Sequence, residues 1–218
     1  MGDFVNNRIS LLFVSFASVC IAQTPSSDKV NNFPFMCDAT VSYYGNALIY
    51  AAQHDSVDYV RACLCEPCCY VDCKGKNGCT ALWWAAARNN PEILRALLAA
   101  KASVNIANKD GCTPLMNAAD KANVEAVRIL LDAGADVKAV NNKQETALHA
   151  AAGGTSLDEF VFDTRQESCK QRKTEEYKTI ITMLLAAGID KKLRNKAGKT
   201  AYEVALECNN LELAELLK

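Results

Sequence analysis

Short apolar segments separated by polar turns run through residues 45–218 of the chain. Within one of them, the threonine–proline pair at 113–114 favours a helix start, because a threonine hydroxyl accepts bonds from free amides and proline fits the first turn. A second helix follows over residues 124–131, where the apolar residues recur at helical spacing. Gly134 is placed to end that helix. The pattern therefore predicts pairs of short helices.

The same pattern returns at a fixed interval. Thr80, Thr113 and Thr146 are evenly spaced, and Thr200 follows after the same interval lengthened by an insertion. Asn46 takes the place of the threonine one interval before Thr80. Since no single unit can bury its apolar face alone, a period of about 33 residues indicates units that stack on their neighbours.

The period and the openings of the units, such as GCTPLMNAA and ETALHAAAGG, resemble those of ankyrin repeats. The resemblance implies an all-α solenoid of helix-turn-helix units with β-hairpin fingers, in one ankyrin-repeat domain over residues 45–218. The units are about residues 45–77, 78–110, 111–143, 144–195 with an insertion at 155–176, and 196–218. Residues 167–178 hold no Gly or Pro, so we expect them to extend the second helix of the fourth unit backward.

The amino-terminal segment has a different character. Ile9 to Ala22 contain no ionisable group except Cys20, a run too short to span a bilayer. With small residues before Gln23, it predicts a cleaved signal peptide over 1–22, followed by a linker and cap over 23–44. We therefore expect a periplasmic or secreted protein without a membrane span in the mature chain. Lipid anchoring at Cys20 is disfavoured, because a branched valine precedes it.

Composition and motifs exclude several function classes. A formal net charge of −1 provides no bulk cationic field to collect phosphates, so nucleic-acid binding is not expected. The two histidines, His54 and His149, stand in no catalytic motif, and His149 falls on the histidine of the T-P-L-H opening. We expect no enzyme activity, no cofactor and no metal.

Ankyrin arrays bind proteins through finger tips and first-helix surfaces, so the resemblance implies a partner-binding face. Candidate contact residues lie at the matching positions of the fingers and first helices: Lys74, Lys76, Trp83, Arg88, Lys109, Asp120, Lys121, Asn142 and Glu145. Lysines gather in the finger segments and carboxylates in the second helices. That distribution predicts a basic edge opposite an acidic edge, and a partner with an acidic face.

Residues 63–79, CLCEPCCYVDCKGKNGC, hold six of the eleven cysteines. Disulfides, a metal site and free thiols all remain open for this loop. An exported chain favours disulfides, while the single C-x2-C spacing at Cys65 and Cys68 is weak support for zinc. The disulfide candidates are Cys37, Cys65, Cys68, Cys69, Cys73, Cys79, Cys169 and Cys208, with a Cys169–Cys208 bridge expected over the last repeat.

Two functions follow from these observations. The first is a non-enzymatic protein–protein interaction module, an exported adaptor or inhibitor that binds its partner on a concave face. The alternative is a redox or metal-handling protein that uses the cysteine loop on an ankyrin scaffold.

Overall fold

The computed structural model describes residues 37–66, 69–153 and 166–218, and their side chains except those of 37–44 and 166–173. These ranges hold ten α-helices and no strand. The helices are α2 (Cys37–Gln53), α3 (Val57–Leu64), α4 (Ala81–Arg88), α5 (Pro91–Ala99), α6 (Pro114–Asp120), α7 (Val124–Asp132), α8 (Ala147–Gly153), α9 (Gln166–Ala186), α10 (Ala201–Glu207) and α11 (Leu211–Leu217).

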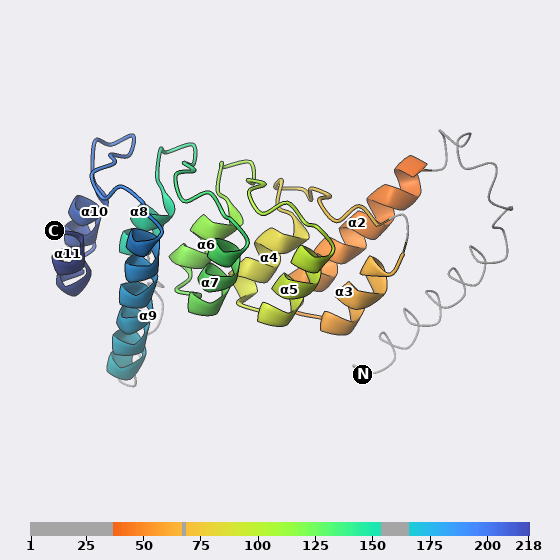
Figure 1. Cartoon of the computed structure of the whole chain (residues 1–218), viewed down its shortest axis with the longest axis horizontal. Helices are drawn as coiled ribbons and strands as arrows, with labels where there is room; N and C mark the ends of the chain where they lie inside the picture. Colours follow the sequence, from red (N-terminus) through yellow and green to blue (C-terminus); the bar gives the residue numbers. More distant parts are fainter. Residues whose placement is uncertain (1–36, 67–68, 154–165) are drawn as a thin grey trace, which may run out of the picture. The chain divides into compact units, whose positions relative to one another are not determined.

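Within residues 39–218, which form one compact unit, the helices stand in two rows (Figure 1). The first helices α4, α6, α8 and α10 each pack on the next member of their row. The second helices α3, α5, α7, α9 and α11 do the same in the other row. The prediction of an all-α solenoid of stacked helix pairs is confirmed.

Side-chain size explains why the two rows differ. The first helices bury small residues, such as Ala85 and Ala86 in α4 and Ala118 and Ala119 in α6, and these allow neighbouring backbones to approach closely. The second helices bury larger aliphatic residues, such as Leu130 of α7. One continuous core results, and it runs through every layer of the stack.

A threonine begins each helix pair after the first. The hydroxyl groups of Thr80, Thr113 and Thr200 accept a hydrogen bond from the backbone N–H three residues later, at 3.2 to 3.3 Å. Thr80, Thr113 and Thr146 are also buried. Each such cap contributes about 1 kcal/mol to helix stability. The capping role predicted for Thr113 is confirmed, and Thr80 and Thr200 share it.

The segments before the threonines are the fingers: residues 72–79, 105–112, 138–145 and 192–199, called the first to fourth finger. No strand is assigned within the described fingers, and each is a tight turn closed by backbone hydrogen bonds, such as the one from Asn108 N–H to the Cys112 carbonyl at 3.0 Å. In the second finger, Asn108 Oδ1 accepts bonds from the backbone N–H of Asp110 and Cys112, both at 2.9 Å. The asparagine side chain thus braces a turn that backbone bonds also close.

Neighbouring fingers are joined by single backbone hydrogen bonds. Lys109 N–H donates to the Asn77 carbonyl at 3.0 Å, and Asn142 N–H donates to the Asp110 carbonyl at 2.9 Å. Lys196 N–H donates to the Lys143 carbonyl at 2.8 Å in the same way. These bonds hold successive fingers in register.

Two boundaries differ from simple repeat arithmetic. Helix α2 begins at Cys37, so residues 37–44, expected as linker and cap, belong to the first helix of the first pair. Helix α9 begins at Gln166, as predicted from the helix-forming residues 167–178. Residues 154–165 of the insertion lie outside the described ranges.

A left-handed backbone position in each finger generates the first prediction. Gly78, Gly111 and Gly198 have φ near +76, while Gln144 holds the equivalent place in the third finger with φ +58. A residue with a Cβ is strained there by roughly 1 kcal/mol. We expect Gln144→Gly to raise the free energy of unfolding by up to about 1 kcal/mol in urea titrations.

The matched control is Gly111→Ala. A Cβ at Gly111 would lie 2.9 Å from the Asn142 backbone nitrogen, so this variant should lose stability through both strain and collision. If Gln144→Gly destabilises the chain, the conformational account of the fingers is wrong.

Candidate partner-binding face

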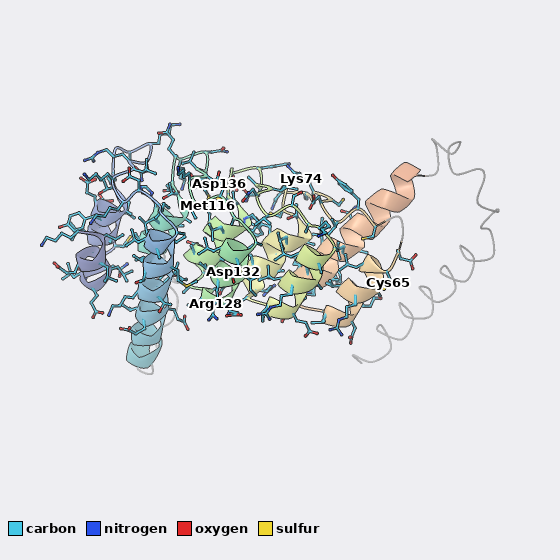
Figure 2. The ribbon with its side chains drawn as sticks, viewed as in Figure 1. Cys65, Lys74, Met116, Arg128, Asp132 and Asp136 are labelled. Atoms are coloured by element: carbon cyan, nitrogen blue, oxygen red, sulfur yellow. The ribbon has the colours of Figure 1, made fainter. Side chains whose placement is uncertain are left out.

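The lysines predicted as contact residues lie exposed on the fingers. Lys74 and Lys76 belong to the first finger and Lys109 to the second, and Figure 2 shows Lys74 on the finger side of the stack. Within the described part of the chain, several finger lysines form no ion pair: Lys74, Lys76, Lys109, Lys138, Lys143, Lys192 and Lys196.

The positive charge is greatest on the fourth finger, whose residues 192–199 hold four cations and no carboxylate. Arg194 pairs with Glu203 at 3.0 Å, and Lys199 pairs with Glu207. Lys192 and Lys196 keep their charge uncompensated by any described residue. The finger edge therefore carries free positive charge.

The second-helix edge carries charges of both signs, and ion pairs between layers neutralise part of the negative charge expected there. Glu92 of α5 forms an ion pair with Arg61 of α3, and Glu125 of α7 forms an ion pair with Arg95 of α5 at 2.8 Å. Glu212 of α11 likewise meets Lys178 of α9 at 2.6 Å. These carboxylates are matched by cations of adjacent layers. Each exposed pair adds little stability, but together they leave that edge without a strong field.

The Trp83 side chain forms a hydrogen bond that the sequence did not predict. Its indole Nε1–H donates to the Cys112 carbonyl at the base of the second finger, at 3.2 Å. The ring meets Trp84 edge-on, with centroids 5.2 Å apart and an interplanar angle of 82°. Trp84 packs against the core. Trp83 is half-buried, and its polar atom is already satisfied within the chain.

His149 makes the equivalent bond two layers further on. Its Nε2–H donates to the Lys199 carbonyl at 3.1 Å, while Nδ1 lies 2.9 Å from the Thr146 hydroxyl. Cys112 and Lys199 each stand directly before the threonine of the next layer. Trp83 therefore replaces the histidine of the T-P-L-H opening as the donor that ties one layer to the following finger.

The other two layers use this position differently. Met116, which Figure 2 labels on α6, offers no N–H donor in its side chain. In the last layer Glu203 completes a capping box with Thr200, and the described chain has no further finger to bond. The hydrogen bond from the Thr200 backbone N–H lowers the pKa of the Glu203 carboxyl. Burial raises this pKa, but the effect of the hydrogen bond is larger.

The remaining first-helix candidates lie at the far end of their helices. Arg88 Nε–H donates to the Gln53 carbonyl at 3.0 Å. Asp120 and Lys121 form an ion pair at 3.1 Å, and the Asp120 carbonyl accepts the hydroxyl of Tyr177 at 2.6 Å. An eight-residue helix is about 12 Å long, so these three residues form a group separate from the finger lysines.

Asn142 and Glu145 are engaged within the fingers. The Asn142 side-chain amide donates to the Lys109 carbonyl at 3.0 Å, and Glu145 accepts the Asn141 amide at 2.9 Å. Both side chains therefore help to order the third finger. Of the nine predicted contact residues, the three lysines of the fingers are those with free functional groups.

Two hollows open near the fingers. One, of about 300 Å³, lies between the third and fourth fingers and is lined by Lys143, Glu145, Asn195, Lys196 and Ala197. The other, of about 220 Å³, lies beside the first finger and is lined by Ile49, Gln53, Gly75, Lys76, Asn77, Cys79 and Trp84. Sequence reasoning missed Ile49, Gln53 and Gly75. The available signal was Gly75 itself, which stands where the other fingers carry asparagine.

The cysteine loop is only partly described. Cys65, Cys73, Cys79 and Cys208 form no disulfide with another described residue, Cys69 is half-buried, and the side chains of Cys37, Cys68 and Cys169 lie outside the described residues. The disulfides, including Cys169–Cys208, therefore stay predictions. Among the described side chains, no group of three His, Cys, Asp or Glu is placed to hold a metal ion.

The buried thiols have a chemical property in common. Burial raises the pKa of Cys63 to about 11, with further contributions from Cys69 and Glu66. Burial also raises the pKa of Cys79 and of Cys112. Since the thiolate is the reactive form, these three thiols are poor nucleophiles at neutral pH, and Cys63 packs in the core as a small apolar residue.

The indole bond predicts unequal roles for the two tryptophans. We expect Trp83→Phe to lower the free energy of unfolding by about 1 kcal/mol more than Trp84→Phe, because only Trp83 loses a hydrogen bond. Urea titrations of both variants provide the measurement. Equal losses would show that the Trp83–Cys112 bond contributes nothing.

His149 predicts a pH dependence. Burial lowers the pKa of its imidazole below the ordinary 6.5, so the neutral ring is the native form. Below pH 6.5 the imidazole is protonated in the unfolded chain but stays neutral in the native protein. The free energy of unfolding therefore falls as the pH decreases. We expect His149→Phe to be less stable than wild type at pH 7.5 and to lose less stability between pH 7.5 and 5.5. Parallel losses in urea titrations at both pH values would contradict this.

The comparison with known families agrees with this geometry. The family described as ankyrin repeats (3 copies) matches residues 21–108 and 86–161. No curated protein matches the chain. Among the described helices, none has the length and apolar content needed to cross a membrane. Ankyrin repeats generally serve in protein–protein interaction and are not enzymes. With more than half of its length matched and its helix pairs stacked as described, this chain belongs to the ankyrin-repeat family.

Proposed function

We propose that the protein is a non-enzymatic adaptor or inhibitor that binds a protein partner through the concave face formed by its fingers and first helices. The segment it binds is acidic. One observation carries this proposal: seven finger lysines have no carboxylate partner in the described chain, whereas several carboxylates of the second helices pair with cations of neighbouring layers. The unpaired finger lysines can bind an acidic partner without first breaking an ion pair within the chain.

The order of the fingers supports the same function. Backbone bonds at 2.8 to 3.0 Å hold each finger to the next, and asparagine side chains fix the turns. A face held in this way loses little conformational entropy when it binds. Surface lysines on such a face mainly accelerate association and select acidic partners.

The proposal also includes export of the protein from the cytoplasm. The apolar run before Gln23 has the form of a signal peptide, and the high cysteine content suits an oxidising compartment. Residues 1–36 lie outside the described structure, so this part rests on the amino-acid pattern. The protein would act in the periplasm or outside the cell, and its partner would be found there.

Neutralising the first two fingers tests the charged face. We expect Lys74→Gln, Lys76→Gln and Lys109→Gln together to weaken binding by about tenfold at low salt, since three exposed charge contacts are worth roughly 0.5 kcal/mol each. The partner is the protein recovered by pull-down from the exported fraction. Surface plasmon resonance at two salt concentrations is the measurement, and the free energy of unfolding should stay within about 0.5 kcal/mol.

A matched control adds the same charge to the other edge. Ala62, Ala99 and Ala133 are exposed on or directly after the second helices, and changing all three to Glu also alters the net charge by three. This control should bind with nearly wild-type affinity. Equal weakening by both triple variants would mean that net charge, and not the finger face, governs binding.

A further inference from the structure

We propose that the hollow beside the first finger receives one apolar side chain from the acidic segment of the partner. This inference rests on the proposed function and assigns it an anchoring subsite. Ile49 of α2 and Trp84 of α4 supply the apolar lining, while Lys76 and Gln53 supply polar groups. Its volume of about 220 Å³ is below the range of small-molecule pockets and suits a single side chain.

The strongest support comes from Gly75. The residue five positions before the threonine is Asn108 in the second finger, Asn141 in the third and Asn195 in the fourth. Each asparagine Oδ1 accepts two backbone N–H groups of its own turn, at 2.8 to 3.1 Å. In the first finger, Gly75 holds this position and has no side chain to accept such bonds.

Backbone conformation does not require glycine at residue 75. Gly78, Gly111 and Gly198 have positive φ, but Gly75 is not among the positive-φ residues of the described chain. Any residue can adopt its conformation. The missing asparagine is therefore not explained by strain in the turn.

Crowding does not require glycine either. A Cβ at Gly75 would lie 3.4 Å from the Cys79 carbonyl oxygen and 3.5 Å from Ile49 Cδ1. These are ordinary van der Waals distances, so a side chain can be accommodated. What it would change is the hollow, because Gly75 and Ile49 both line it. The glycine keeps this space open and leaves the turn without its usual brace.

The surroundings define the chemistry of the occupant. Burial raises the pKa of the Cys79 thiol, so the sulfur presents a neutral surface beside Trp84 and Ile49. Lys76 at the hollow and Lys74 beside it are exposed and form no ion pair within the described residues. An aromatic or large aliphatic side chain flanked by carboxylates matches both features, and aromatic anchors dominate many protein interfaces.

Two labelled peptides test the subsite on the full chain: Asp-Glu-Asp-Phe-Asp-Glu-Asp, and the same peptide with Ser in place of Phe. Fluorescence anisotropy gives the affinity of each. Burial of a phenyl ring predicts that the Phe peptide binds roughly tenfold to a hundredfold tighter than the Ser peptide. Gly75→Asn should bring this ratio close to one while raising the Tm, because it fills the hollow and completes the turn.

The reverse substitution in the fourth finger is the matched control. Asn195→Gly should lower the Tm and leave the Phe-to-Ser ratio unchanged, since the fourth finger does not line the hollow. Gly75→Ala provides an intermediate variant if Gly75→Asn folds poorly. It places one methyl group against Ile49 and should reduce the ratio part of the way.

Several outcomes overturn the subsite. Equal, salt-sensitive binding of both peptides would reject the hollow and leave the charged-face function intact. A Phe preference that survives Gly75→Asn and Gly75→Ala would place the apolar contact elsewhere. Absence of binding by either peptide would also reject this inference, while the pull-down partner and the lysine variants judge the proposed function independently.

Discussion

The whole structure depends on the contact between one helix pair and the next. A single pair is too thin to enclose its own apolar residues, and residues such as Leu94, Leu130 and Leu184 reach zero exposure only through the stack. Stability in such an array is a sum of weak units and favourable interfaces. In the last described layer Leu206, Leu211 and Leu216 are exposed, although glutamates alternate with them.

Polar bonds across the layers give this apolar stack its register. The Asn123 side-chain amide donates to the carbonyls of Ala86 and Ala87 at 2.7 and 3.0 Å, which lie at the end of the helix in the preceding layer. Asn210 repeats this bond towards Ala152 at 3.4 Å. At the other end of the first helices, Trp83 and His149 bond forward to the next finger. The second and third layers, and likewise the fourth and fifth, are thus tied at both ends of their first helices, which helps to fix the surface that the fingers present.

The fold was predictable because the spacing of the threonines can be read directly from the sequence. Thr80 and its equivalents mark where the first helices begin, and the repeat period marks where each layer begins. The helix pairs and their stacking could therefore be predicted from the sequence. The reversal of the chain in each finger was also expected, but a turn motif does not indicate which groups close the turn. In the second finger, backbone bonds between Asn108 and Cys112 and the Asn108 Oδ1 atom both do so.

The candidate site was less predictable, because its properties depend on which side chains already have partners. Sequence position correctly placed Lys74 and Lys109 on the fingers. It also proposed Trp83 and Asn142 as contacts, but their polar atoms bond to carbonyls one layer away. The hollow depends on Ile49 and Gly75, which belong to separate segments of the sequence, so no linear motif contains it. The missing asparagine at residue 75 was the one readable sign.

The contrast between the two edges follows from the repeat itself. Glu92 and Arg95, and Glu125 and Arg128, stand three residues apart at equivalent positions of α5 and α7. Stacking such layers brings the arginine of one beside the glutamate of the next, so neutralisation repeats with the layers. Thr179 and Thr182 hold these positions in α9, and the series stops there.

The fingers repeat cations without repeating a carboxylate at bonding distance. Lys76 and Lys109 stand one repeat apart at the same finger position, so stacking places like charges in successive fingers. Like charges in neighbouring layers repel, and no internal partner within the described residues removes that repulsion. An acidic ligand laid along the fingers would relieve it at several layers together. The periodicity that stabilises one edge of the stack thereby leaves the other edge suited to a charged partner.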